Sequence, residues 1–310
     1  MESLVGYTGF VGSNLASEHP FDGLYNSKNI TEAFGTRPDL LVYAGVPAEM
    51  FLANHDPAAD LAVLQGAAEN IRRIAPRRLV LISTISVYDD PVGADEDSPI
   101  DKSRLPAYGA NRRWLEEWAE EQMPERLIVR LPALYGRGLK KNFLYDYIHF
   151  LPPLLTEKKR AELGEREPLI AQSYLPRGDG FYRCAPVEGE AREALKAAFR
   201  RTGFSALSFT DSRSQYQFYG LSRLWGDIQR ALELGLERLN LATAPVTAAE
   251  VYRALCGGEF VNHLDKPPFH YDFRTRHWEA MGGRGGYLED KETELARIRA
   301  FVAEQEGAGC

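Results

Sequence analysis

Residues 3–14 read SLVGYTGFVGSN, with three glycines between a short apolar run and a helix-like segment. Gly6, Gly9 and Gly12 have the spacing GxxGxxG. A sharp turn from strand to helix needs residues that are free of Cβ clashes, and a pyrophosphate needs the backbone to come close to the helix N-terminus. Unpaired N–H groups and the helix dipole favour negative charge there. Because the glycines lie at the first strand–helix junction, they predict a dinucleotide-binding turn.

Strand and helix patterns alternate in the residues that follow the glycines. Residues 58–74 place apolar side chains at three- and four-residue steps, which is typical of an amphipathic helix. Residues 107–121 predict a second helix with Trp114, Leu115 and Trp118 on one side. Short apolar runs predict strands at 23–26, 39–45, 77–83 and 126–132. Because such alternation produces parallel sheets covered on both faces, we predict an α/β fold: a Rossmann doubly wound parallel sheet with a smaller C-terminal α/β substrate lobe.

The composition excludes several other classes of protein. The chain is 44% apolar and 26% charged, as in a globular protein, and its formal net charge of −7 argues against a nucleic-acid partner. No apolar run reaches the roughly 18–20 residues that a membrane-spanning helix needs, so we expect no membrane partner. The start, MESLVGYTGF, has no basic region, which predicts a cytoplasmic protein without a signal peptide. We interpret Cys184, Cys256 and Cys310 as reduced thiols and expect no metal site.

Five motifs occur in the order found in one enzyme superfamily. They are VGYTGFVGSNL (5–15), LVYAG (41–45), LVLISTISVY (79–88), YGANR (108–112) and IVRLPALYGRG (128–138). With these motifs the chain resembles the extended short-chain dehydrogenase/reductases, which include nucleotide-sugar epimerases, dehydratases and reductases. The resemblance is strong over residues 1–140 and patchy near 216–240. There, FYGLSRLWGDIQRAL is similar to the segment that returns to the nucleotide domain.

The resemblance implies three catalytic residues, Thr84, Tyr108 and Arg112. In the superfamily a tyrosine hydroxyl exchanges a proton with the substrate oxygen, and a Ser or Thr holds that oxygen. A lysine four residues after the tyrosine binds the nicotinamide ribose, but Arg112 occupies this position here. A tyrosine with a pKa near about 10 needs a nearby cation to act as a base at neutral pH, and the donor fork of arginine could hold both ribose hydroxyls. We interpret the site as active with an exchanged cation.

The resemblance also implies the residues that bind the cofactor. A carboxylate at the end of the second strand would bind the ribose diol of NAD and repel a 2′-phosphate. The sequence has Asn26, Ser27 and Lys28 there, so we expect NADP, with NAD as the alternative. The expected cofactor-binding residues are Gly6, Thr8, Gly9, Phe10, Val11, Gly12, Asn26, Ser27, Lys28, Ala44, Gly45, Ser83, Tyr108, Arg112 and Pro132.

The residues that follow Thr84 narrow the expected reaction. Related 4,6-dehydratases have Thr-Asp-Glu here and related decarboxylases have a glutamate at the position of Ser86, whereas this chain reads Thr84-Ile85-Ser86. Without those carboxylates we expect an oxidoreductase or epimerase that acts on a hydroxyl or keto carbon of a nucleotide-linked sugar or a similar polyol. The expected substrate-binding residues are Ser86, Lys140, Lys141, Asn142 and Arg213.

Two departures from the superfamily keep a second function open. Arg112 replaces the lysine, and Ala133 stands where relatives commonly have an asparagine. The alternative to an enzyme is therefore a catalytically silent NAD(P)-binding regulator or sensor of the same fold.

The resemblance implies a division of the chain and an oligomeric state. We expect residues 1–138, with a returning segment near 216–240, to form the dinucleotide-binding domain. Residues 139–215 and 241–310 would form the substrate-binding lobe. In relatives, the helix with the tyrosine and the long helix before it form a two-fold interface, so we expect a homodimer through these helices.

Overall fold

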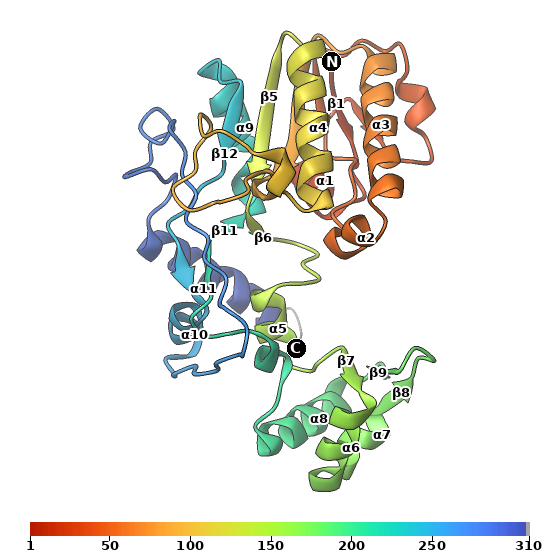
Figure 1. The fold of residues 1–310 in the computed structure, drawn as a ribbon, viewed down its shortest axis with the longest axis vertical. Helices are drawn as coiled ribbons and strands as arrows, with labels where there is room; N and C mark the ends of the chain where they lie inside the picture. Colours follow the sequence, from red (N-terminus) through yellow and green to blue (C-terminus); the bar gives the residue numbers. More distant parts are fainter. Residues whose placement is uncertain (308–310) are drawn as a thin grey trace. The chain divides into compact units, whose positions relative to one another are not determined.

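A six-stranded parallel sheet is the largest sheet of the structure, a computed structural model that describes residues 1–307 (Figure 1). Its strand order is β12-β5-β4-β3-β1-β2. The chain passes from β1 to β2 on one side and then crosses to β3 on the other, so the order reverses between β1 and β3. In open parallel sheets, ligands bind at the carboxyl ends of the strands beside such a reversal. The strands are β1 (Glu2–Val5), β2 (Gly23–Tyr25), β3 (Leu40–Tyr43), β4 (Arg78–Thr84), β5 (Arg126–Leu131) and β12 (Arg238–Asn240).

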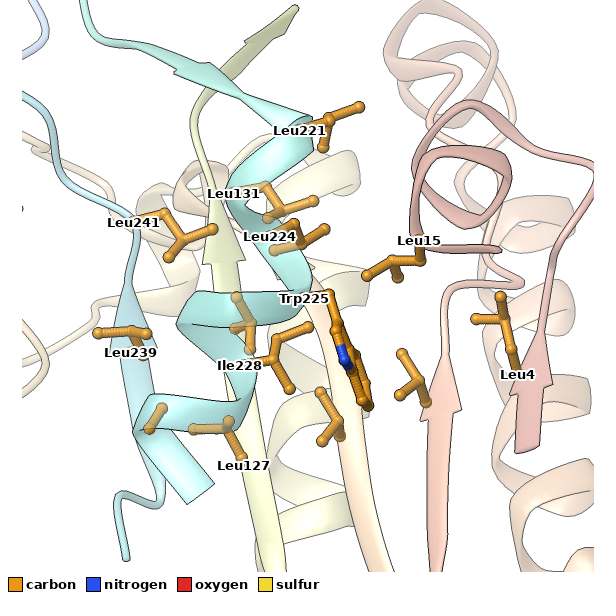
Figure 2. Packing of buried hydrophobic residues seen from close by; sticks show 14 of the residues in the cluster. Leu4, Leu15, Leu127, Leu131, Leu221, Leu224, Trp225, Ile228, Leu239 and Leu241 are labelled. Atoms are coloured by element: carbon orange, nitrogen blue, oxygen red, sulfur yellow. The ribbon is translucent and has the colours of Figure 1, made fainter. Parts of the chain in front are cut away.

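Helices cover both faces of this sheet. Successive residues of a strand point to opposite faces, so the apolar side chains of one strand pack against helices on both sides. In β5, Leu127, Val129 and Leu131 pack with α1 (Phe10–Glu18) and α9 (Leu224–Glu233), and Figure 2 shows Leu15 and Trp225 of these helices in this cluster. Ile128, between them in sequence, packs with α3 (Pro57–Ile74) and α4 (Ala107–Gln122) on the other face. The doubly wound parallel sheet predicted from the sequence is therefore confirmed, as are its predicted strands and both of its predicted amphipathic helices.

The chain forms two compact units, each with its own core. The first comprises residues 1–139, 215–246 and 270–298, and holds the parallel sheet. Its other elements are η1 (Ile30–Ala33), α2 (Met50–His55), η2 (Ile85–Val87), η3 (Lys102–Arg104), β6 (Ala133–Tyr135), β10 (Gln215–Tyr216), β11 (Phe218–Gly220) and η5 (Leu221–Arg223), together with β13 (Val246–Thr247) and α11 (Lys291–Gly307), which both continue into the second unit.

The second unit comprises residues 140–214, 247–269 and the described residues from Arg299 on. A three-stranded antiparallel sheet, β7-β9-β8, packs with helices around Leu195 and Phe199, so the smaller α/β lobe is present as predicted. Residues 241–246 and 270–298, which were predicted to lie in this lobe, belong to the first unit. The elements of the second unit are α5 (Phe143–His149), β7 (Leu154–Thr156), α6 (Glu157–Arg166), α7 (Pro168–Ser173), β8 (Tyr174–Pro176), β9 (Phe181–Cys184), α8 (Gly189–Thr202), η4 (Ala206–Phe209) and α10 (Ala248–Cys256).

Trp114 and Trp118 are half-buried and pack on the core between α3, α4 and the sheet. Part of the apolar surface of α4 is therefore covered within the subunit, and the homodimer through α3 and α4 remains a prediction.

Three further sequence expectations concern membranes, metals and thiols. None of the helices in residues 1–307 combines the length and the apolar character needed to cross a bilayer. Within the same residues, no group of three or more His, Cys, Asp or Glu side chains could hold a metal ion. Cys184 is half-buried and Cys256 is exposed, and both are free thiols. Cys310 lies outside the described residues.

Candidate functional site

The glycine turn joins β1 to α1 at the carboxyl edge of the sheet. Gly6 has a φ of +94°, and a Cβ at this position would lie 2.4 Å from the carbonyl oxygen of Ala44. A Cβ on Gly12 would lie 2.1 Å from the carbonyl oxygen of Gly6. Both distances are far shorter than any real carbon contact, so the close approach of β3 and α1 to the turn requires glycine at residues 6 and 12.

The beginning of α1 fits the phosphates of a dinucleotide. Gly9 is the N-cap residue, so no side chain occupies the N–H groups of the first turn, and that turn contains no acidic residue. The N–H of Gly9 donates to the Gly6 carbonyl over 2.9 Å, which closes the turn. Unpaired N–H groups at a helix start bind anions, and bare backbone lets a phosphate come close. The predicted residues Thr8, Phe10 and Val11 lie in the same turn.

The end of β2 lies directly beside the glycine turn, since the N–H of Gly6 donates to the carbonyl of Tyr25 over 2.7 Å. The Asn26 side chain accepts from the N–H of Lys28 over 2.9 Å, so its amide oxygen shapes the turn. Ser27 and Lys28 are exposed. Ser27 and Lys28 thus offer a hydroxyl and an ammonium group where a dinucleotide would place its adenosine ribose. Neither residue brings a carboxylate to that place.

The end of β3 supports the turn from the other side. The N–H of Ala44 donates to the carbonyl of Val5 over 2.9 Å, which extends the pairing of β3 with β1. A Cβ on Gly45 would lie 2.9 Å from Cγ1 of Val5. The Val5 side chain therefore leaves no room for a Cβ on residue 45, and the predicted contact of Ala44 and Gly45 with a cofactor remains a prediction.

Asn14 links α1 to the segment after β6, a role that was not predicted from the sequence. Its buried side chain accepts from the N–H of Arg137 over 3.1 Å and donates to the Arg137 carbonyl over 2.9 Å. A Cβ on Gly136 would lie 2.8 Å from its amide oxygen. The available signal was a polar residue at an inward helical position two residues after Gly12. Pro132, predicted to contact the cofactor, is a half-buried residue between β5 and β6.

Tyr108 lies in the first turn of α4 and is 7% exposed. Its N–H donates to Oδ1 of Asn54 on α2 over 2.9 Å. The adjacent Gly109 packs tightly on η2, since a Cβ there would lie 2.1 Å from the carbonyl oxygen of Ser86. Burial raises the pKa of the Tyr108 hydroxyl, whereas the Arg112 charge and hydrogen bonds with Arg112 and Thr84 lower it, and Asp60 raises it. The net effect is a raised pKa, so the hydroxyl is protonated at neutral pH.

Thr84 ends β4 and meets Tyr108, so two of the predicted catalytic side chains come together. The Thr84 hydroxyl accepts from the N–H of Ser86 over 3.1 Å and lies 3.2 Å from the Ser86 hydroxyl. Thr84, Ser86 and Tyr108 therefore place three hydroxyl groups at the carboxyl end of β4. This is the same edge of the sheet that carries the glycine turn.

Arg112 is 6% exposed, and its guanidinium is committed within the protein. Nη1 donates to Asp60 over 2.7 Å and to the carbonyl of Tyr108 over 3.2 Å, while Nη2 donates to the carbonyl of Pro47 over 2.7 Å. The guanidinium carbon lies 3.7 Å from the centre of the Tyr108 ring. The predicted cation is next to Tyr108, but it is partnered by a carboxylate, and these three bonds compete with the ribose contacts expected from the sequence.

Ser83 has a structural partner as well. Its hydroxyl donates to Glu116 of α4 over 2.6 Å, and Glu116 in turn accepts two bonds from Arg130, of 3.0 and 2.7 Å. The Ser83 hydroxyl thus donates its proton within a buried ionic network, and the predicted cofactor contact of Ser83 remains a prediction.

Four of the predicted substrate residues belong to the second unit. Lys140 and Lys141 are exposed residues that precede α5. Asn142 is the N-cap of α5 and accepts from the N–H groups of Leu144 and Tyr145. Arg213 forms a two-bond ion pair with Asp211, over 2.9 and 2.7 Å. Asn142 and Arg213 have structural roles in this unit, and the substrate contacts of all four residues remain predictions.

Comparison with known proteins gives similarity in fold. A scan of protein-family models gives no match, and neither does a search of curated proteins. The dTDP-4-dehydrorhamnose reductase of Bacillus anthracis, determined in complex with NADP, has a TM-score of 0.61 and 16% identity over 98% of both chains. The UDP-glucose 4-epimerase of Thermotoga maritima, determined with UDP-glucose, has a TM-score of 0.58 and 13% identity over 99% of both chains. An NAD-dependent NDP-hexosamine 5,6-dehydratase involved in tunicamycin biosynthesis has a TM-score of 0.59 and 16% identity, over 99% of this chain and 97% of that one.

The chain has the same overall fold as these sugar-nucleotide enzymes. The resemblance that the motifs predicted is thereby confirmed at the level of the fold. The similar structures include a reductase, an epimerase and a dehydratase, so the fold does not separate these reactions. Any distinction between them has to come from the side chains around Thr84 and Tyr108.

Proposed function

We propose that the chain is an NADP(H)-dependent enzyme that reduces or epimerises a keto or hydroxyl carbon of a nucleotide-linked sugar. One observation carries the proposal: the Thr84 and Tyr108 hydroxyls meet at the carboxyl end of β4, on the same sheet edge as a glycine turn fitted to phosphates. A protein that only bound the dinucleotide would not need an acid and a second hydroxyl there.

Each side chain has a role set by its chemistry. Tyr108, protonated at neutral pH, donates its proton to the oxygen of a keto carbon as that carbon becomes an alcohol. Thr84 donates a hydrogen bond to the same oxygen and orients it. The N–H groups at the start of α1 hold the phosphates, and Ser27 and Lys28 favour a 2′-phosphate. NADPH, when bound, supplies the hydride.

The residues beside Thr84 support reduction or epimerisation over dehydration. Elimination of water needs an additional acid and base near the sugar. The residues that follow Thr84 are Ile85, which is buried, and Ser86, whose hydroxyl lies near that of Thr84. Neither side chain exchanges protons at neutral pH, so the site is equipped for chemistry at a single carbon.

Turnover tests the proposal directly. The protein is mixed with NADPH and a panel of 4-keto sugars linked to UDP, GDP, CDP or dTDP, and the NADPH absorbance is followed. UDP-glucose and UDP-galactose, incubated with NADP⁺ as the hydride acceptor and analysed by chromatography, test epimerisation. We expect one of these substrates to be consumed by the wild type and left intact by the Tyr108→Phe variant. Consumption at the wild-type rate by Tyr108→Phe would overturn the assignment of the site.

The committed guanidinium of Arg112 favours a second candidate, a silent NADP(H)-binding protein. Its donors contact Asp60, Tyr108 and Pro47, whereas the superfamily uses a cation at this position to bind ribose. In this alternative, NADPH binds by calorimetry but no sugar of the panel is turned over. The paired Thr84 and Tyr108 hydroxyls argue for the enzyme.

A further inference from the structure

The residue that partners Arg112 has a role that the sequence motifs do not contain. We propose that Asp60 is a positioning residue for Tyr108, holding the Arg112 guanidinium over the tyrosine ring and balancing its charge, so that Tyr108 serves as a proton donor. This inference rests on the proposed function, because it assigns the Tyr108 hydroxyl a proton-transfer role.

The contacts of Asp60 connect α3 to the beginning of α4. Its Oδ2 accepts from Nη1 of Arg112 over 2.7 Å and from Nδ2 of Asn111 over 2.9 Å. Asn111 also donates to the carbonyl of Pro57 over 3.0 Å. Asp60 lies in the first turn of α3, where the helix dipole stabilises a carboxylate. Its side chain is 12% exposed, so this ion pair is largely shielded from water.

The position of Arg112 is determined by three acceptors on three different segments. Asp60 lies on α3, the Pro47 carbonyl precedes α2, and the Tyr108 carbonyl belongs to the first turn of α4. Together they keep the guanidinium 3.7 Å from the centre of the Tyr108 ring. Because a planar guanidinium both stacks on the ring and bonds in its own plane, this arrangement suits arginine and not lysine.

The charges around Tyr108 then decide which form of the hydroxyl is stable. A lone guanidinium beside a tyrosine favours the tyrosinate, whereas a carboxylate opposes it. Both effects act here: Arg112 lowers the pKa of Tyr108 and Asp60 raises it, while burial contributes the largest increase. Because Asp60 offsets the charge of Arg112, burial remains the largest effect on the pKa of Tyr108.

Other charged groups near α4 are engaged elsewhere. Lys102 of η3 pairs with Glu117, and Arg104 of η3 pairs with Asp89. On β5, Arg130 pairs with Glu116. On α2, His55 stacks against Phe51 and is exposed. Among the described residues, the charges that shift the pKa of Tyr108 are those of Arg112 and Asp60, which pair with each other.

The experiment measures the titration of Tyr108 without requiring turnover. The protein is labelled with ¹³C at the tyrosine ring carbon that bears the hydroxyl, and the Tyr108 resonance is assigned by its loss in Tyr108→Phe. In Asp60→Asn the unbalanced guanidinium should lower the titration midpoint by about 1–3 pH units, the range for an opposite charge at this distance. In Arg112→Gln the remaining carboxylate should raise the midpoint. The double variant should return close to the wild-type value, because both charges are gone.

A matched control tests whether the position of the removed carboxylate matters, or only the loss of one negative charge. Asp56 lies four residues before Asp60, and its carboxylate accepts from the N–H of Ala59 at the start of α3. Asp56→Asn removes the same charge nearby, keeps a good N-cap, and should leave the Tyr108 midpoint unchanged. An equal midpoint in wild type and Asp60→Asn would overturn the inference. If Asp60→Asn does not fold, an unchanged midpoint in Arg112→Gln overturns it instead.

The outcomes also separate this inference from the proposed function. For an active enzyme, the fall in the reduction rate at high pH should move in Asp60→Asn by the same amount as the midpoint. A shifted midpoint in a protein that turns over no sugar would support the charge balance and contradict the enzyme. Turnover that depends on Tyr108, with equal midpoints in wild type and Asp60→Asn, would support the enzyme and contradict the role of Asp60.

Discussion

Gly6 and Ala44 approach so closely that a Cβ on residue 6 would lie 2.4 Å from the Ala44 carbonyl oxygen. The φ of Gly6, +94°, is also one that a residue with a Cβ rarely adopts. The two strands that flank the reversal of the sheet, β1 and β3, meet here. This close backbone approach therefore links the order of the strands to the shape of the glycine turn.

Gly6→Ala should distort this turn. The backbone conformation alone costs an alanine about 1–3 kcal/mol, and the contact with Ala44 adds to that cost. We expect a lower free energy of unfolding in urea and the loss of measurable NADPH binding by calorimetry. Gly66→Ala is the control, because Gly66 lies inside α3 with open space around it and should gain about 0.5–1 kcal/mol. Wild-type NADPH affinity in Gly6→Ala would show that the turn does not hold the phosphates.

Lys28→Glu should reverse the preference for the cofactor. Lys28 is exposed beside the turn, and a carboxylate there would repel a 2′-phosphate and accept from a ribose hydroxyl. We expect the affinity for NADPH to fall at least about tenfold, equivalent to about 1.4 kcal/mol, and the affinity for NADH to rise. Lys158→Glu, an exposed lysine in the second unit, is the matched charge control. Tighter binding of NADH than of NADPH by the wild type would refute the NADP assignment.

Tyr108→Phe and Thr84→Val should impair turnover while sparing cofactor binding. Loss of a general acid costs about 10²–10⁴ in rate, so Tyr108→Phe should lower kcat by at least about a hundredfold. Thr84→Val removes one orienting hydrogen bond, and its effect should be smaller. NADPH affinity by calorimetry should change little in both. Tyr182→Phe in the second unit serves as the control, and a similar loss of turnover there would remove the special role of Tyr108.

Glu116→Ala should be strongly destabilising. Glu116 is fully buried and accepts two bonds from Arg130, which is 1% exposed. Removing the carboxylate leaves a buried guanidinium without its partner, a change that typically costs about 3–5 kcal/mol. Glu117→Ala, one residue later and partly exposed, should change the free energy of unfolding by less than about 1 kcal/mol. Equal unfolding midpoints in urea for the two variants would contradict the buried network.

Glu294 makes stability depend on pH in the direction opposite to that of a paired carboxylate. It is fully buried in α11, and burial raises its pKa to about 7, although Tyr135, Arg223 and Arg297 act to lower it. Between its ordinary pKa near about 4.3 and pH 7, the folded state holds a proton that the unfolded state has released. The free energy of unfolding should therefore fall as the pH rises through this interval.

Glu294→Gln removes this dependence. At pH 8 the variant should be more stable than the wild type by up to about 3 kcal/mol, whereas near pH 4 the two should be similar. Glu292→Gln, exposed on the same helix, is the control. Urea unfolding of all three proteins at several pH values checks the prediction, which fails if Glu294→Gln and the wild type show the same dependence on pH.

The sequence by itself determined the features that depend on neighbours along the chain. The glycine spacing predicted the turn at residues 6–12, and the periods of two and 3.6 predicted the strands and helices of the parallel sheet. The motif order placed Thr84 at the end of a strand and Tyr108 at the start of a helix. Such local signals are strong because backbone conformation and the burial of one face constrain each residue directly.

Only the tertiary structure decided which polar side chains are paired. Arg112 was expected to be free for ribose, but Asp60, 52 residues earlier, forms an ion pair with it. Ser83 was expected at the cofactor, but its hydroxyl donates to Glu116, and Asn14 connects to Arg137, 123 residues away. These partners are brought together by the order of strands and the packing of helices, which no local pattern records. The protonation of Tyr108 therefore depends on the fold, because the carboxylate of Asp60 offsets the effect that the charge of Arg112 has on the tyrosine hydroxyl.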